Sequence, residues 1–216
     1  MSADLHDPRP AAAERAGGDD RAFPRLLPWV LTVAGGLGLL SALDLSYERL
    51  LLATDPDYRP SCSFNPLLDC GAVASSDQAS AFGDFPNTLL GVAAFAVVVT
   101  LGVLALLGVR LPRPVRLGLQ VGVLVGFAFV QWLVHVSVFQ LGVLCPYCMV
   151  VWVCTVTLFS YVTLANAADG VLGARLARSP LVRTLVIAHP VPVVLWVAAV
   201  AALVGVVFAD QWALML

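Results

Sequence analysis

Four long segments of this chain carry no charged side chain, and they constrain its fold more than any other feature. They cover residues 26–43, 85–109, 117–168 and 184–209. A helix that crosses a bilayer needs roughly 20 apolar residues, because a rise of about 1.5 Å per residue must cover about 30 Å of hydrocarbon. With 60% hydrophobic and only 12% charged residues in all, the chain is predicted to be an integral membrane protein and not a soluble globule.

The third uncharged segment is long enough for two spans, and each of the others for one. As a straight helix it would measure about 78 Å, so we expect it to fold back at a turn marked by Gly142 and Pro146. The predicted fold is all-α, a transmembrane domain over residues 26–216. Its five spans are expected at about residues 27–48, 87–109, 117–140, 146–168 and 191–210. Residues 1–25 mix charges with Pro and Gly and are expected to form a disordered tail.

The arginines predict how the chain is oriented in the membrane. The chain has no lysine, and of its twelve arginines only Arg49 and Arg59 fall on one side of the five-span arrangement. By the positive-inside rule, the amino terminus is expected in the cytoplasm and the carboxyl terminus outside, in a multi-pass protein of the plasma (inner) membrane. The net charge of -2 offers no basic face for a nucleic-acid partner.

Four of the five cysteines are then expected at the outer surface. Cys62 and Cys70 lie in the long loop, residues 50–84, and Cys145 and Cys148 lie where the fourth span begins. This outer compartment is the oxidising one, in which disulfides persist. Cys154 falls inside the fourth span and is interpreted as a small apolar side chain.

The Cys145-Pro-Tyr-Cys148 sequence is predicted to be reactive because it opens a helix. A thiol at a helix amino terminus lies near free backbone N–H groups and the positive end of the dipole, which favours the thiolate. Pro146 fits a first helical turn, where its missing N–H costs nothing. The Cys145 thiolate could attack a disulfide and Cys148, one turn deeper, could resolve the mixed disulfide. Cys70 could supply the other half of such a relay, with Cys62 facing solvent partners.

Two other interpretations of the cysteines remain open at this point. Cys62 and Cys70 could form a structural disulfide that pins an exposed loop, without redox turnover. All four outer thiols could bind zinc, although paired zinc cysteines are usually separated by two to four residues and Cys62 and Cys70 are separated by seven. No metal is therefore assigned.

A thiol relay that ends in a membrane needs a lipid-soluble electron acceptor, and a quinone takes the two electrons of one disulfide. Polar side chains within the spans are candidates to contact it, because such groups are costly in lipid and usually face the bundle interior. Asn87 opens the second span, and Gln131 and His135 share one face of the third. Gln131 and His135 could instead form interhelical hydrogen bonds. Trp152 could be a core residue, an interface anchor or a ring partner for the quinone.

The combined order of these motifs resembles the vitamin K epoxide reductase family in its bacterial form, over about residues 27–212. The resemblance rests on the two-cysteine loop, on the Cys-Pro-Tyr-Cys that opens the fourth of five spans, and on Ser76, Phe82, Gly83, Asn87 and Gly91 between them. It implies a four-helix bundle around a quinone pocket, a fifth helix alongside and the long loop over the outer mouth. The implied activity is reduction of a membrane quinone with reoxidation of a periplasmic thioredoxin-fold oxidase of the DsbA type.

The resemblance also assigns roles to individual residues. Cys62 and Cys70 match the shuttle pair, with Cys70 passing electrons to Cys145, and Cys148 matches the cysteine next to the quinone. Asn87 matches a hydrogen-bond donor to a quinone carbonyl, and Ser76 matches a serine of the capping loop. The family often has a tyrosine where this chain has Trp152, which offers one N–H and no hydroxyl.

The resemblance also bears on the partner and the quinone. Many bacterial relatives carry a thioredoxin-like domain after the fifth span, and because this chain ends at Leu216 we expect a separate partner protein. An Ala-, Val- and Arg-rich composition without lysine suggests a GC-rich genome, and menaquinone is the quinone guessed on that basis. A DsbB-type enzyme is disfavoured, because it carries its two cysteine pairs in the reverse order.

Overall fold

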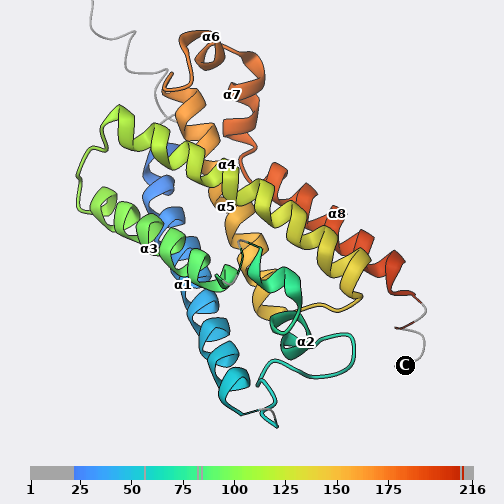
Figure 1. Cartoon of the computed structure of the whole chain (residues 1–216). Helices are drawn as coiled ribbons and strands as arrows, with labels where there is room; N and C mark the ends of the chain where they lie inside the picture. The colour runs from blue at the N-terminus through green and yellow to red at the C-terminus, as the bar shows by residue number, and fades with distance from the viewer. Residues whose placement is uncertain (1–21, 56, 82, 84, 210, 212–216) are drawn as a thin grey trace, which may run out of the picture.

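The structure is a computed structural model that describes residues 22–55, 57–81, 83, 85–209 and 211. These residues form an all-α protein of long helices joined by short ones (Figure 1). The long helices are α1 (Ala22–Thr54), α3 (Asn87–Leu106), α4 (Arg113–His135), α5 (Pro146–Ala168) and α8 (Val191–Val207). The short elements are α2 (Cys70–Ala74), η1 (Asp77–Ser80), η2 (Val136–Leu141), α6 (Ala174–Ala177) and α7 (Pro180–Ile187).

Four helical segments are long and apolar enough to cross a membrane: Leu26–Thr54, Asn87–Leu106, Arg113–Leu141 and Pro146–Ala168. The pair α7 and α8, bent by 74° at a short break, passes the same test if it is taken as one span. The chain is therefore a multi-pass membrane protein with four or five spans.

The helix bounds refine the sequence prediction at several ends. The fourth span was predicted at residues 146–168 and α5 covers the same residues. By contrast, α1 begins at Ala22 and continues to Thr54, so residues 22–25 of the predicted tail and the start of the long loop are helical. The rest of the predicted tail lies outside the described residues. The second span ends at Leu106, shortly before Gly108 takes a positive φ of 83°.

Helices α1 and α3 pack closely because small residues lie where they cross. A Cβ atom on Gly102 of α3 would lie 2.8 Å from the backbone nitrogen of Thr32 on α1, closer than two such atoms can approach. Gly35 and Gly38 of α1 likewise face Val99 and Phe95 of α3. Glycines at this crossing allow the backbones to approach, as is common between membrane helices.

Helix α5 is the centre of the bundle and packs against α1, α4, α7 and α8. At one end a polar network joins it to α4. Arg116 donates to Asn166 at 3.0 Å and to Asp169 at 2.7 Å, and the Asn166 side chain, 2% exposed, also donates to Gln120 at 3.0 Å. Because both amide atoms of Asn166 have partners, we interpret this network as structural: it holds α4 against α5. We call this end of the bundle the arginine end.

At the opposite end, which we call the thiol end, the long loop is tied to the turn before α5. An isolated parallel bridge pairs Leu68 with Leu144: the Asp69 N–H donates to the Leu144 carbonyl at 3.0 Å, and the Leu144 N–H donates to the Leu67 carbonyl at 2.8 Å. The Leu67 side chain is 1% exposed and packs into the same cluster as Trp152 and Phe208. The loop is thus anchored in the bundle in the middle of its length.

Candidate functional site

Three sulfur atoms meet at the thiol end. Cys62 and Cys70 form a disulfide, and the Cys145 Sγ lies 3.3 Å from the Cys70 Sγ. Cys145 and Cys148 are free thiols in this state. Thiol–disulfide exchange needs a thiolate in contact with a disulfide sulfur. Two cysteine pairs that are 75 residues apart in the chain are therefore placed for direct exchange through Cys70 and Cys145.

Local structure explains why Cys70 and Cys145 meet. Each cysteine directly follows a segment of the Leu68–Leu144 bridge, so the bridge fixes the register of the two segments. Cys70 is the first residue of α2, and Asp69 caps this helix by accepting from the backbone N–H groups of Gly71 at 2.8 Å and Ala72 at 3.3 Å. Side-chain capping satisfies N–H groups that a helix leaves unpaired, and here it orients Cys70 toward Cys145.

The position of Cys145 favours its thiolate. It is the residue before the first turn of α5, and its sulfur accepts the backbone N–H of Cys148 at 3.4 Å. A hydrogen bond from the Cys148 side chain, opposed by burial and assisted by the backbone N–H groups of Cys148 and Tyr147, lowers the pKa of the Cys145 thiol. A thiol with a lowered pKa is a better leaving group in disulfide exchange. The expected placement of the Cys-Pro-Tyr-Cys motif at a helix start is therefore seen here.

The sequence analysis expected Cys62 to face solvent, and this expectation is wrong for the arrangement in the structure. The Cys62 side chain is 3% exposed, and it packs with Leu45, Cys70 and Cys145 in one buried cluster. The reason is that the disulfide points inward, toward Cys145, while Ser61 on one side and Phe64 on the other are exposed. An external thiol cannot reach the disulfide in this arrangement.

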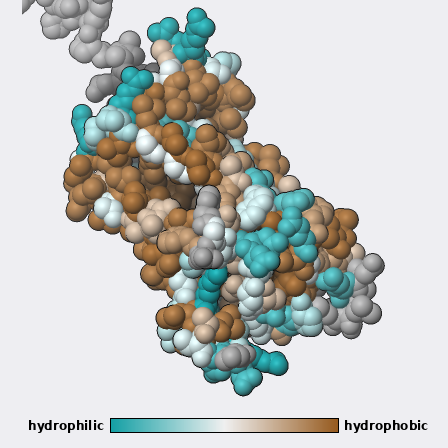
Figure 2. Space-filling model, viewed as in Figure 1, coloured by the Kyte–Doolittle hydropathy of each residue, from teal (hydrophilic) through white to brown (hydrophobic). Residues whose placement is uncertain are grey.

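A large apolar cavity begins beside Cys148. It has a volume of about 950 Å³ and lies between α1, α3, α4 and α5. Figure 2 shows a hollowed, hydrophobic face where α3 and α4 diverge, so the cavity opens sideways toward the position of lipid. A cavity of this size and polarity can hold a lipid-soluble small molecule.

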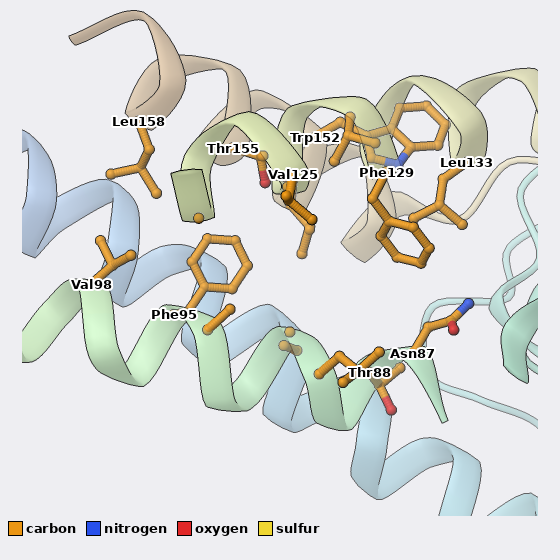
Figure 3. A pocket seen from close by; sticks show the side chains of 18 of the residues that line it. Asn87, Thr88, Phe95, Val98, Val125, Phe129, Leu133, Trp152, Thr155 and Leu158 are labelled. Atoms are coloured by element: carbon orange, nitrogen blue, oxygen red, sulfur yellow. Dashed lines mark hydrogen bonds between the residues drawn. The ribbon is translucent and has the colours of Figure 1, made fainter. Parts of the chain in front are cut away.

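Most of the cavity wall is apolar, with a few polar side chains among the residues that line it. Asn87 and Thr88 lie on α3, and Trp152 lies across the cavity on α5, one helical turn after Cys148 (Figure 3). Among the described residues, the buried side-chain polar atoms without a hydrogen-bond partner are Thr88 Oγ1 and Trp152 Nε1. Both residues line this cavity, so each has a donor left for a bound molecule.

Asn87, the predicted quinone contact, lines the cavity, but its amide already forms hydrogen bonds within the protein. Its Nδ2 donates to the Gln78 carbonyl at 2.7 Å and its Oδ1 accepts the Ala81 N–H at 2.9 Å, which holds η1 against the start of α3. A primary amide carries two N–H donors, so one remains for a ligand. Asn87 therefore positions the segment over the cavity mouth in addition to any contact with a bound molecule.

Three other predicted contacts do not line this cavity. The Ser76 hydroxyl donates to the Val73 carbonyl at 2.7 Å, within the loop. Gln131 accepts the indole N–H of Trp196 at 2.9 Å, so it joins α4 to α8, as the interhelical alternative anticipated. The His135 ring lies 5.1 Å from the ring of Phe139 in η2. Gln131 therefore faces α8, and His135 is exposed beside Phe139.

Two charged residues of the site were missed. Glu48 and Arg49, adjacent near the end of α1, bind two separate parts of the long loop. Arg49 donates to the Ala79 carbonyl at 2.9 Å and to Ser80 Oγ at 2.8 Å and also lines the cavity. Glu48 is 4% exposed and accepts from Tyr58 and Ser61. The sequence did hold a signal for these two residues. A charged side chain next to an apolar span is costly to bury, so Glu48 and Arg49 should each have a specific hydrogen-bonding or charged partner.

The fold and site define a class of protein: a helical membrane protein whose two cysteine pairs are in contact at one end of the bundle. Residues 29–163 match the model of the vitamin K epoxide reductase family. The match covers more than half of the chain, and the chain belongs to this family. No match was found among the curated proteins compared.

Proposed function

We propose that this protein oxidises the dithiol of a separate, DsbA-like thioredoxin-fold protein outside the cytoplasm and passes the electrons to a membrane quinone. The observation that carries the proposal is the 3.3 Å contact between Cys70 and Cys145, combined with the apolar cavity beside Cys148. Family membership supports a disulfide and quinone redox activity. A quinone accepts two electrons and two protons and leaves as the quinol, which matches one dithiol oxidised.

The proposed electron path consists of thiol exchanges that balance. A partner thiolate attacks the Cys62 sulfur, and the Cys70 thiolate leaves; the second partner thiol then closes the partner's own disulfide and frees Cys62. Cys70 attacks the Cys145 sulfur of a Cys145–Cys148 disulfide and releases the Cys148 thiolate. Cys62 finally attacks Cys70, which reforms their disulfide and releases Cys145. The product state has a Cys62–Cys70 disulfide and two free thiols, as in the structure.

The cavity residues would bind and orient the acceptor next to Cys148. Cys148 and Trp152 lie on the same face of α5, and both line the cavity. The unpaired indole N–H of Trp152 is a donor for one carbonyl oxygen of a quinone, and the remaining Asn87 N–H is a donor for another. The apolar walls would exclude water from the Cys148 sulfur. Menaquinone is the quinone that we propose to test first.

The proposal also assigns an orientation. The thiol end lies outside the cytoplasm, in the oxidising compartment, and the arginine end lies inside. Electrons would enter at the outer surface and leave into the outer half of the bilayer, so no charge needs to cross the full membrane within the protein.

The test follows quinone absorbance with purified wild-type protein, Cys148→Ser and Cys62→Ser. The donors are dithiothreitol and then a reduced thioredoxin-fold protein. We expect wild type to reduce menaquinone with either donor, Cys148→Ser to lose the activity with both, and Cys62→Ser to keep it with dithiothreitol only. If folded wild type reduces no quinone, the protein is not a quinone reductase, and a purely structural role for the disulfide becomes the better interpretation.

A further inference from the structure

Glu48 is a buried carboxylate that the proposed electron path does not use. It accepts three hydrogen bonds: from the Tyr58 hydroxyl at 2.7 Å, from the Ser61 hydroxyl at 2.7 Å and from the Ser61 backbone N–H at 3.2 Å. All three partners donate, so the carboxyl group acts only as an acceptor, which is the behaviour of its ionised form. No arginine in the described part of the chain forms an ion pair with it.

These hydrogen bonds fasten one specific segment of the long loop. They join residues 58–61 to the side of α1, and we call the three side chains of Glu48, Tyr58 and Ser61 the clasp. Ser61 directly precedes Cys62, whose side chain is 3% exposed. Since a thiol must contact the sulfur that it attacks, residues next to Cys62 must move before any external thiol can react.

The rest of the loop is held to the bundle by contacts of its own. Leu67 is buried in the bundle, and the bridge from Leu68 to Leu144 fixes the approach to Cys70. Further along, Arg49 and Asn87 hold η1 from two different helices. Opening at the clasp would therefore expose Cys62 while Cys70 keeps its place beside Cys145.

We propose that the clasp is the gate for the incoming thiol, and that Cys62 is attacked only from a state in which residues 58–61 have left Glu48. In that step the external thiolate forms a bond to the Cys62 sulfur, the Cys62–Cys70 bond breaks and the electron pair leaves on Cys70. The inference rests on the proposed function for its biological meaning. The gate itself is a property of the loop and is testable without a quinone or a protein partner.

The test measures how fast dithiothreitol reduces the Cys62–Cys70 disulfide in the full-length protein. A Cys145→Ser background removes the internal thiol that contacts Cys70, and maleimide labelling with mass spectrometry counts the new thiols. We expect Glu48→Gln to accelerate reduction about tenfold, because hydrogen bonds to a charged acceptor are lost and the open state becomes more populated. Tyr58→Phe and Ser61→Ala, which each remove one hydroxyl, should accelerate it severalfold.

Asp55→Asn is the matched control. It makes the same change from acid to amide near the same end of α1, but the Asp55 carboxylate accepts from the nearby Asp57 N–H at 3.0 Å and not from the segment before Cys62. We expect its reduction rate to equal that of the Cys145→Ser background. Cys154, 5% exposed in the middle of α5, reports on the bundle, because it is labelled only if the bundle opens.

Two results would overturn the gate. The first is an unchanged reduction rate in Glu48→Gln and in Tyr58→Phe. The second is a faster rate that is matched by faster labelling of Cys154, which would mean that Glu48 stabilises the bundle as a whole. If Glu48→Gln does not fold, Tyr58→Phe decides the question, because it removes only the hydroxyl group of Tyr58. If wild type reduces no quinone, the disulfide-reduction rates measured here keep their meaning. The proposed function and the gate can therefore be disproved independently of each other.

Discussion

At the scale of single residues, Trp152 has a polar atom without a partner although its side chain is only 2% exposed. Leaving a buried donor unpaired is unfavourable, so we interpret its N–H as a ligand contact in the place where the family often has a tyrosine. Trp152→Phe keeps an aromatic ring and removes the donor. We expect the KM for menaquinone to rise roughly fivefold, the effect of one ordinary hydrogen bond, with a smaller change in kcat.

Trp132→Phe is the matched control for this prediction. Trp132 stacks on Phe129 at a centroid distance of 5.5 Å but does not line the cavity. The same substitution there should leave both kinetic constants near their wild-type values. Equal increases in KM for the two variants would show that the indole N–H of Trp152 is not a specific contact.

Asp69 gives the site a dependence on acid pH. Burial alone would raise its pKa, but hydrogen bonds from the Ser63 hydroxyl and from the Ala72 and Gly71 N–H groups prevail, and the pKa of Asp69 is lowered from 3.8. The contribution of the ionised Asp69 carboxylate to the stability of the folded protein is therefore fully present above pH 3.8. It is lost as the pH falls through the lower pKa that Asp69 has in the folded state. We expect Asp69→Ala to lose about 1 kcal/mol at pH 7, as for other caps. The difference in Tm from wild type should shrink only below pH 3.8.

At the scale of helices, the crossing of α1 and α3 depends on Gly102. In Gly102→Ala, the new Cβ would lie 2.8 Å from the Thr32 nitrogen and 2.9 Å from the Leu31 Cβ, so the helices must separate. We expect a loss of about 1–3 kcal/mol in stability, measured as a lower Tm in detergent. Gly36→Ala is the control, because a Cβ on Gly36 meets no atom within 4 Å. A Tm for Gly102→Ala equal to that of Gly36→Ala would contradict this account of the packing.

The sequence predicted helices better than it predicted contacts between them. The uncharged segments located the spans, and Pro146 marked the first turn of α5, because hydropathy and helix-start preferences are local properties. The partners of Gln131 and Ser76 were not predictable in the same way. Which neighbour faces a given side of α4 depends on how α8 packs, and the Ser76 hydroxyl is captured by a carbonyl three residues earlier.

The four cysteines were proposed as the site from their spacing and resemblance, but their contact depends on the assembled molecule. The Leu68–Leu144 bridge and the burial of Leu67 place Cys70 against Cys145, and neither feature has a local sequence signal. The buried position of Cys62 was missed for the same reason. Cys62 is buried because its disulfide to Cys70 points toward Cys145, and Glu48 of α1 binds the adjacent Ser61.

At the scale of the whole molecule, the contacts of α8 favour a fifth span. Trp196 of α8 donates to Gln131 of α4, and Phe208, 1% exposed, packs beside Leu67 and Trp152 at the thiol end. Helix α7, which precedes α8, packs near the arginine end against α5. Since α8 runs beside membrane-spanning helices to the thiol end, and α7 leads into it from near the arginine end, we expect it to cross the bilayer, although its 17 residues rise only about 26 Å.

This topology is tested by fusing reporters at three points of the chain. A fluorescent protein that folds only in the cytoplasm and a phosphatase active only outside it would be joined after residue 111, after residue 173 and at the carboxyl terminus. With five spans and the arginines inside, the first two fusions should fluoresce and the terminal one should show phosphatase activity. A fluorescent terminal fusion would mean that α7 and α8 return to the inner surface. Phosphatase activity after residue 111 would reverse the orientation and place the thiol end in the reducing cytoplasm, where the Cys62–Cys70 disulfide would not be expected to persist.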